Sequence, residues 1–293
     1  MTAAGDEDDA GLLRYNTPPV WCAQALDLPE DHYRRAGVTR LHGHDRLNVD
    51  ALRPGDLVFV KTDGMEVFAQ VLPRIRVPIG LVTGVSDITP YRHAALAQDE
   101  RVVSWSGTNL PLWSDRIMQI PIGFSERERP HGSRAAILAA AGGRPWEERD
   151  VEVLLTAMAD TSPERRAIAQ DGVTVCAERL AYPDYLALLG RARFVICPPG
   201  NGPDTLRVWE TLATGGIPVV KSGPLDPLYA AHGCLIVPDW TEIPRCVRSR
   251  TDGPALRALA VESFRTRTGP FFAAHWRECV LRHHARLMAQ RTG

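Results

Sequence analysis

The sequence has no C-x-x-C pair, although six cysteines occur among its 293 residues. Neither a structural zinc site nor a dithiol redox motif is therefore indicated. No apolar run approaches the ~20 residues that a membrane-spanning helix needs, and no basic and apolar leader opens the chain. We expect a cytoplasmic protein without a membrane span.

The common nucleotide-binding fingerprints are also missing. A G-x-G-x-x-G motif would need a third glycine after Gly200 and Gly202, but Thr205 stands there. The G-K-S/T of a Walker loop does not occur. The one D-x-D, Asp6-Glu7-Asp8, lies in the small, acidic segment 1–10, which we predict to be disordered. The segment His42–Asp45 has no second metal-ligand cluster to pair with, so we interpret it as a solvated loop and expect no metal.

Charge of one sign does not dominate either. The formal net charge is −1, so no global field attracts the protein to nucleic acid. The hydrophobic fraction of 44% and the charged fraction of 24% are those of an ordinary globular protein. Lys61 and Lys221 are the only lysines, and the heavy use of Arg and Ala suggests a GC-rich bacterial genome.

Two halves of the chain each alternate short apolar runs with helical segments. This alternation predicts parallel sheets with helical crossovers, and thus an α/β fold. We expect an N-terminal Rossmann-like domain over residues 1–145, a C-terminal Rossmann-like domain over 146–270, and a helix over 271–293 that packs back on the first domain. Strands are expected at 57–60, 77–82, 102–105, 117–122, 151–155, 173–176, 194–197, 217–220 and 234–237.

The segment from Phe194 to Val220 carries the densest chemical pattern: a strand, a glycine-bearing loop, a helix near 204–214, a Gly-Gly turn and another strand. Gly200 and Gly202 allow the backbone to approach a ligand closely, and Asp204 is a plausible N-cap residue. The N-terminus of this helix would then point beyond the strand ends, which favours an anion site.

Two charged residues, Arg207 and Glu210, follow on the flank opposite the expected core face of that helix. Arg207 can reach a diphosphate, and Glu210 can accept hydrogen bonds from two adjacent ribose hydroxyls. The alternative is an exposed i,i+3 ion pair worth a few tenths of a kcal/mol. The glycine loop before the pair and the G-G-I-P-V-V sequence after it favour the binding interpretation.

This segment resembles the C-terminal signature of exostosin-like glycosyltransferases, which have the GT-B architecture. The similar features are the Pro-Gly loop, the Arg207-x-x-Glu210 helix and the Ile217-Pro218-Val219 strand start. Shorter matches extend the resemblance over roughly residues 55–240, for example Ser86-Asp87 and Thr161–Arg165. The resemblance implies two Rossmann-like domains facing a central cleft, and an inverting, metal-independent transfer that often uses a UDP-sugar.

Without a metal, cations and a helix dipole must offset the charge of the departing diphosphate. Arg207, Arg165 and Lys221 are the candidates. Arg207 lies in the first turn of the expected helix, and Arg165 and Lys221 lie near the carboxyl ends of expected strands. The full donor-binding set that we predict is Gly200, Asn201, Gly202, Asp204, Thr205, Arg207, Glu210, Arg165 and Lys221.

An inverting displacement also needs a general base for the acceptor, expected from the N-terminal domain. Asp87, on the loop after the 77–82 run, is the first choice. Asp63 lies in the same way after the preceding strand, and His93 has the more suitable unperturbed pKa. A turn or capping role for each aspartate and a surface position for His93 are the alternatives.

The sequence thus predicts transfer of a sugar, for example from UDP-glucuronic acid or another UDP-hexose, to a small soluble acceptor, and we expect a role in secondary metabolism. A fucosyltransferase-like enzyme that uses a GDP-sugar and a non-catalytic nucleotide-sugar-binding module are the two alternatives.

Overall fold

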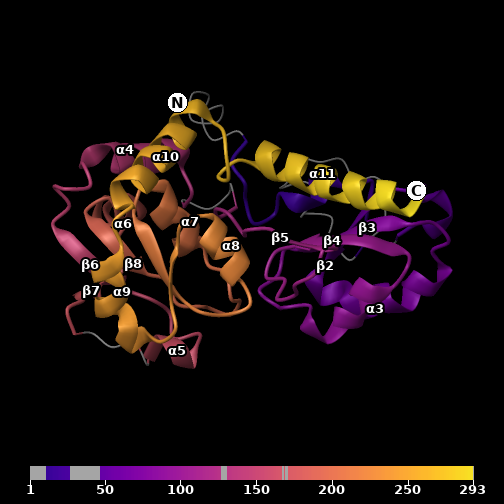
Figure 1. Ribbon diagram of the computed structural model, residues 1–293, viewed down its shortest axis with the longest axis horizontal. Helices are drawn as coiled ribbons and strands as arrows, with labels where there is room; N and C mark the ends of the chain where they lie inside the picture. The colour runs from indigo at the N-terminus through magenta and orange to yellow at the C-terminus, as the bar shows by residue number, and fades with distance from the viewer. Residues whose placement is uncertain (1–10, 27–46, 127–130, 167, 169–170, 293) are drawn as a thin grey trace. The chain divides into compact units, whose positions relative to one another are not determined.

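The computed structural model describes residues 11–26, 47–126, 131–166, 168 and 171–292, in two compact units (Figure 1). The N-terminal unit comprises Leu13–Ile122 and Ala273–Gly293, and the C-terminal unit comprises Met1–Leu12 and Gly123–Phe272. We expected the chain to divide near residues 145 and 270, and the nearest divisions between the two units lie at 122/123 and 272/273. The expectations for segment 1–10 and for His42–Asp45 concern residues outside the described ones. None of the helices described combines the length and hydropathy that crossing a bilayer requires.

The N-terminal unit contains a parallel sheet whose described strands follow chain order, β1-β2-β3-β4-β5. Right-handed crossovers in a sheet of this order all run over one face. The other face must therefore be covered by an element that is not a crossover. Figure 1 shows α11 (Ala273–Thr292) along one face and α3 (Met65–Val71) along the other. The strands are β1 (Gln24–Leu26), β2 (Leu57–Lys61), β3 (Ile79–Gly84), β4 (Val102–Gly107) and β5 (Ile117–Gln119).

Short 3-10 helices make up most of the remaining connections in this unit. They are η1 (Pro18–Trp21), η2 (Val49–Ala51), η3 (Thr62–Gly64), η4 (Leu72–Arg74) and η5 (Tyr91–Gln98). The four predicted strands are confirmed, with shifts of one to three residues at their ends, whereas β1 lies in a segment whose pattern indicated no element. The central strands β2 and β3 are almost continuously apolar and buried, as expected for a covered parallel sheet, and Val58, Val60 and Trp105 are fully buried.

A buried histidine attaches α11 to this sheet. The imidazole of His284 is 5% exposed; its Nδ1 lies 2.8 Å from Ser104 Oγ, and its Nε2 lies 3.1 Å from the carbonyl oxygen of Gly55. These partners fit the neutral ring, with Nε2–H donating to the carbonyl and Nδ1 accepting from the serine hydroxyl. Burial lowers the pKa of His284, a shift that the hydrogen bond to Gly55 opposes and the neighbouring His283 reinforces.

We therefore expect the free energy of unfolding to fall as the pH drops below about 6.5, the unfolded histidine pKa. Below that pH the unfolded chain binds a proton at His284 that the folded unit does not bind. The contribution of neutral His284 to the free energy of unfolding is therefore present above that pH and is lost below it. Melting temperatures of wild type and His284→Gln, compared at pH 7.5 and 5.5, measure this contribution. A smaller loss between the two pH values is expected for the variant, and an identical loss would contradict the assignment.

The C-terminal unit contains a second parallel sheet, whose described strands have the order β10-β9-β8-β6-β7. The chain runs outward from β6 to β7, then crosses back to β8 and continues to β9 and β10 on the other side. The direction of winding therefore reverses between β6 and β8. The strands are β6 (Val151–Thr156), β7 (Thr174–Cys176), β8 (Ala192–Ile196), β9 (Ile217–Lys221) and β10 (Leu235–Val237), which confirms the five predicted in this half.

Helices cover both faces of this sheet. The connections are α5 (Pro163–Arg166), α6 (Tyr182–Leu189), α7 (Leu206–Ala213) and α8 (Asp226–Ala231). The other helices of the unit are α4 (Arg134–Gly143), η6 (Trp240–Glu242), α9 (Ile243–Ser249) and α10 (Gly253–Thr266). Because α4 and α10 pack on α7, and six of its eight residues are buried, that helix is buried on most of its circumference.

Candidate functional site

A pocket of about 340 Å³ lies in the C-terminal unit, at the carboxyl ends of β6 and β8. This is the point where the strand order reverses, and open α/β sheets bind ligands at such a point because the loops on either side diverge. The lining residues come from the ends of β6 and β7 and the loops after them, from α5 and α6, from the start of α7, and from the segment before α4. They are His131, Thr156, Ala157, Met158, Ala159, Arg165, Cys176, Glu178, Arg179, Leu180, Tyr182, Tyr185, Thr205, Leu206, Arg207 and Glu210.

Helix α7 directs its N-terminus into this pocket. Its N-cap residue is Thr205, with extended backbone angles, and Gly215 at φ +77° follows its C-terminal end. The partial positive charge at a helix N-terminus favours anions there. The predicted N-cap, Asp204, is therefore wrong by one residue. Its carboxylate instead accepts hydrogen bonds from Trp209 Nε1 at 2.9 and 3.1 Å and from the Tyr229 hydroxyl at 3.1 Å.

Two arginines reach the pocket, and neither forms a salt bridge within the described residues, although the charges of Asp160 and Glu210 act on Arg165 and Arg207 from farther away. Arg207 donates from Nη2 to the carbonyl oxygen of Ala157 at 3.0 Å. Arg165 donates from Nε to the carbonyl oxygen of Pro199 at 2.8 Å and from Nη1 to that of Ala159 at 2.7 Å. Burial lowers the pKa of Arg165, and the charge of Arg207 lowers it further. Two guanidinium groups held side by side by neutral carbonyls attract an anion.

Three buried polar atoms of the pocket lining have no hydrogen-bond partner within the described part of the chain. They are Thr156 Oγ1, Thr205 Oγ1 and Arg207 Nε. Most buried polar groups in proteins are satisfied, and those that are not call for a ligand, water or ion. Their position beside the two arginines indicates a ligand with several oxygen acceptors.

Glu210 lies deeper in the same pocket. Its side chain is 5% exposed, and its Oε2 accepts a hydrogen bond from the Tyr185 hydroxyl at 3.0 Å. Burial raises the pKa of this carboxyl group, while the Tyr185 hydrogen bond and the Arg207 charge act in the opposite direction. The exposed Arg207–Glu210 ion pair considered as the alternative is therefore excluded.

The other predicted donor-binding residues lie around this pocket and do not line it. Gly200 is adjacent to Arg165, since a Cβ built on the glycine would come within 2.9 Å of Arg165 Nη2. The Gly200 amide donates to the Gly202 carbonyl oxygen at 2.9 Å. Asn201 is exposed, and Lys221 Nζ lies 3.8 Å from Glu164 Oε1.

Several lining residues carry no motif that sequence reasoning could detect. Tyr182 and Tyr185 stack with ring centroids 6.1 Å apart, and the His131 ring approaches Tyr182 edge-on at 4.9 Å. The tyrosines share a helix face at i and i+3, a spacing equally typical of an ordinary core face. Only the burial of Glu210 beside these tyrosines distinguishes a pocket wall from an ordinary core face.

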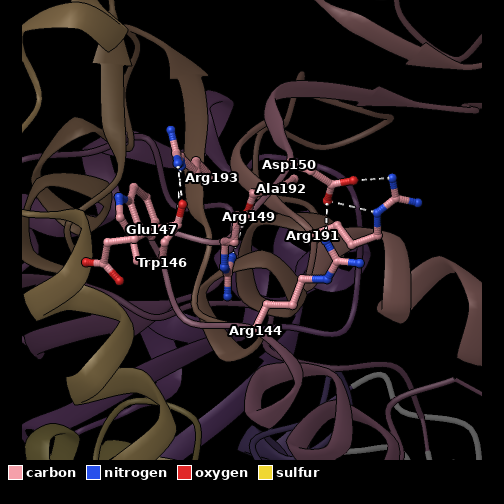
Figure 2. Close-up of polar contacts among 8 residues, drawn as sticks. All are labelled: Arg144, Trp146, Glu147, Arg149, Asp150, Arg191, Ala192 and Arg193. Atoms are coloured by element: carbon pink, nitrogen blue, oxygen red, sulfur yellow. Dashed lines mark hydrogen bonds and ion pairs between the residues drawn. The ribbon is translucent and has the colours of Figure 1, made fainter.

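A buried arginine holds the opposite end of α7. Arg149 donates from Nη2 to the carbonyl oxygen of Thr214 at 2.7 Å and from Nη1 to that of Ala192 at 2.6 Å. It thereby satisfies a carbonyl at the C-terminal end of α7, where a positive charge is also favourable. Figure 2 shows it directed at Ala192, next to Asp150, which pairs with Arg144 and Arg191. Burial lowers the pKa of Arg149 to about 10.

The three candidate bases belong to the N-terminal unit and follow its strands. Asp63 lies in η3 after β2, with Lys61 Nζ 2.8 Å from its carboxylate. Burial alone would raise the pKa of Asp63, but hydrogen bonds from Lys61 and Ser86 lower it overall. Asp87 is exposed on the loop after β3, and His93 is half-buried in η5.

The loop that carries Asp87 has an uncommon backbone. Val85 adopts φ +56° and Asn109, after β4, adopts φ +50°. The left-handed conformation is a marked outlier for a β-branched residue, and such strain occurs preferentially at functional sites. Asn109 Nδ2 donates to the Ser86 carbonyl oxygen at 3.1 Å, which ties the two loops together.

No protein-family model matches the chain, and no curated protein matches it either. Among solved structures, the chain is similar to an α,α-trehalose 6-phosphate synthase from Burkholderia multivorans, with 13% identity over 83% of this chain and 74% of that chain and a TM-score of 0.45. Two UDP-forming α,α-trehalose-phosphate synthases are also similar. The one from Burkholderia xenovorans has 14% identity, coverage of 81% and 75%, and a TM-score of 0.43.

The UDP-forming synthase from Burkholderia vietnamiensis has 13% identity, coverage of 100% of this chain and 86% of that chain, and a TM-score of 0.44. Likeness at these levels assigns no activity.

Proposed function

We propose that this protein is a glycosyltransferase of the GT-B type, related to the exostosin-like family, which binds the nucleoside diphosphate of a sugar donor in the pocket of the C-terminal unit. The observation that carries the proposal is the combination of Arg165, Arg207 and the buried Glu210 at the reversal of strand order. The two arginines and the start of α7 fit a diphosphate, and Glu210 fits the two hydroxyls of a ribose.

The reaction is a single displacement at the anomeric carbon. An acceptor hydroxyl or nitrogen forms the new bond to this carbon while the bond to the diphosphate oxygen breaks. The acceptor proton passes to a general base, for which Asp87 is the first candidate, followed by Asp63 and His93. The negative charge that develops on the leaving diphosphate is stabilised by the arginines, which are already held in place before the reaction.

The donor is proposed to be a UDP-sugar, and thermal stabilisation tests this proposal. UDP should raise the melting temperature by mass action, with GDP doing less. Glu210→Ala should weaken UDP binding by about 2–4 kcal/mol, because two hydrogen bonds to a carboxylate are lost. Glu178→Ala, on the exposed rim of the pocket, is the matched control and should change UDP affinity less.

The outcomes separate the possible functions. Stabilisation by GDP that equals or exceeds that by UDP would favour a fucosyltransferase-like donor. Nucleotide binding without sugar transfer or donor hydrolysis would favour a non-catalytic binding module. If neither nucleotide stabilises the protein at millimolar concentration, the pocket does not bind a nucleoside diphosphate and the proposal is wrong.

Transfer is further proposed to proceed without a metal ion, with Arg165 and Arg207 neutralising the diphosphate. Activity should then survive EDTA with only a small change in rate, because no divalent cation bridges the phosphate oxygens. The measurement is the initial transfer rate with and without chelator. A complete loss that Mn²⁺ or Mg²⁺ restores would show that cations from solution carry out the role assigned to the arginines.

A further inference from the structure

We propose that Tyr185 is the positioning residue of the ribose subsite: its hydroxyl orients Glu210 so that the remaining acceptor positions of the carboxylate select a vicinal diol. This inference rests on the proposed function, since it concerns how the same pocket recognises the sugar of the nucleotide. It assigns to Tyr185 the selection of ribonucleotides over 2′-deoxyribonucleotides.

The geometry fixes one oxygen of the carboxylate. Tyr185 is part of α6 and Glu210 part of α7, and the Tyr185 hydroxyl lies 3.0 Å from Glu210 Oε2. Both side chains line the pocket. A tyrosine hydroxyl donates a single hydrogen bond, whereas a carboxylate offers about four acceptor positions. The bond therefore restrains rotation of the carboxylate, and even with the second hydrogen bond that Tyr182 donates, acceptor capacity remains for a ligand.

A vicinal diol matches this remaining capacity. Its two hydroxyls can each donate one hydrogen bond to a carboxylate that is held in one plane. A 2′-deoxyribose donates only one, so part of the buried carboxylate would lose its water without gaining a partner. Sites built to bind a hydroxyl reject the analogue that lacks it for this reason.

The protonation state of Glu210 should make the preference for a ribonucleotide depend on pH, and Tyr185 should set the pH at which this preference is lost. The groups that face the carboxylate are Tyr185 and Tyr182 on α6, Arg207 on its own helix, and His131 before α4. A protonated carboxyl group would carry a donor in place of one acceptor position and would accept more weakly from the two hydroxyls, because the bonds would no longer be charge-assisted. Because the Tyr185 hydrogen bond opposes the rise in the Glu210 pKa that burial causes, removing it favours protonation.

The experiment compares UDP with 2′-deoxy-UDP, and GDP with 2′-deoxy-GDP, by calorimetry between pH 5.5 and 8.5 in wild type and Tyr185→Phe. In wild type, the ribonucleotide should bind more tightly than its deoxy analogue by about tenfold or more. In Tyr185→Phe this ratio should fall towards one, and the pH below which it declines should move upward. The ratio cancels the titration of the nucleotide phosphate, which both ligands share.

Two further variants identify the titrating group. Glu210→Gln should remove both the ribose preference and its pH dependence, whereas His131→Gln should retain both, with the midpoint moved upward because the charge of His131 lowers the Glu210 pKa. If the pH dependence disappears in His131→Gln, the histidine titrates and the role of Tyr185 in ionising Glu210 is wrong. If Tyr185→Phe does not fold, wild type still provides a test. Equal affinity of wild type for UDP and 2′-deoxy-UDP would by itself overturn the inference.

Equal weakening of both ligands in Tyr185→Phe, at an unchanged pH midpoint, would make Tyr185 a packing residue only. That result would leave the proposed function standing. Failure of wild type to bind any of the four nucleotides would instead overturn the proposed function, and the inference with it.

Discussion

Replacing Arg207 by alanine is expected to weaken UDP binding and to lower the rate of sugar transfer by about 10²–10³-fold. The guanidinium is held by the carbonyl oxygen of Ala157 at 3.0 Å, and its Nε is buried without a partner among the described residues. A preorganised cation of this kind acts most strongly on charge that grows during the reaction. The diphosphate gains its charge as the bond to the sugar breaks, so the rate should fall more than the affinity.

Arg166 provides a matched control for this variant. It is the neighbour of Arg165 in the sequence, but its side chain is 64% exposed and pairs with Asp160. Exposed ion pairs contribute ~0–1 kcal/mol, so Arg166→Ala should leave UDP affinity and transfer rate close to those of wild type. Arg207→Lys should fall between wild type and Arg207→Ala, because it keeps the charge but loses the planar fork of donors. Steady-state kinetics and calorimetry measure both quantities.

A result in which Arg207→Ala behaves like Arg166→Ala would contradict the placement of the diphosphate. The unpartnered Thr156 and Thr205 hydroxyls would then need another ligand. If only the affinity fell and the turnover number stayed constant, Arg207 would contribute equally to the ground state and the transition state.

Local pattern predicted much of the fold. The apolar runs that became β2, β3, β4 and the strands of the second sheet were recognisable because parallel strands covered on both faces are continuously apolar. The three-residue strand β1 was not, since Gln24–Leu26 is too short for any period to show. The order of the strands could not be read from the sequence, because it depends on the direction in which each crossover runs.

The chemistry of the pocket was predictable only in part. Arg207 and Glu210 stand out because a glycine loop precedes them, but helical periodicity placed Glu210 only on the flank opposite the core face of the helix. In the structure a further layer of helices covers α7, so Glu210, Thr211 and Thr214 are all buried. That layer includes α4 and α10, which are distant in sequence, and no local pattern reports their position.

The capping of α7 illustrates the same limit. Asp204 has the side chain of an N-cap, but Trp209 and Tyr229 both donate hydrogen bonds to it. A buried carboxylate with such partners is held in place by tertiary contacts, and the helix begins one residue later. The role that we propose for Tyr185 could not be predicted from the sequence either, since a tyrosine on a helix face is most often a core residue.

The general base gives the second large effect. Asp87→Asn is expected to lower the transfer rate by about 10²–10⁴-fold, the usual contribution of a positioned base. The substitution keeps the volume of the side chain and much of its hydrogen-bonding capacity, so the loop after β3 should retain its backbone. UDP affinity should remain nearly unchanged, because the nucleotide pocket belongs to the C-terminal unit and the residue to the N-terminal unit.

The position of Asp87 supports this choice over its neighbour. It follows Val85 at φ +56°, and the hydrogen bond from Asn109 to the Ser86 carbonyl oxygen fixes the backbone just before it. Asp63 also follows a strand, but its carboxylate pairs with Lys61 at 2.8 Å. Hydrogen bonds from Lys61 and Ser86 overcome the effect of burial and lower the pKa of Asp63, which makes it a weaker base.

Three substitutions made in parallel decide between the candidates: Asp87→Asn, Asp63→Asn and His93→Gln, each tested for transfer rate and UDP affinity. Only Asp87→Asn should lose rate at unchanged affinity, since removing the base slows proton transfer without altering the donor pocket. If Asp87→Asn transfers sugar at close to the wild-type rate, Asp87 is a turn residue. Whichever of Asp63→Asn and His93→Gln then shows the selective loss of rate identifies the base.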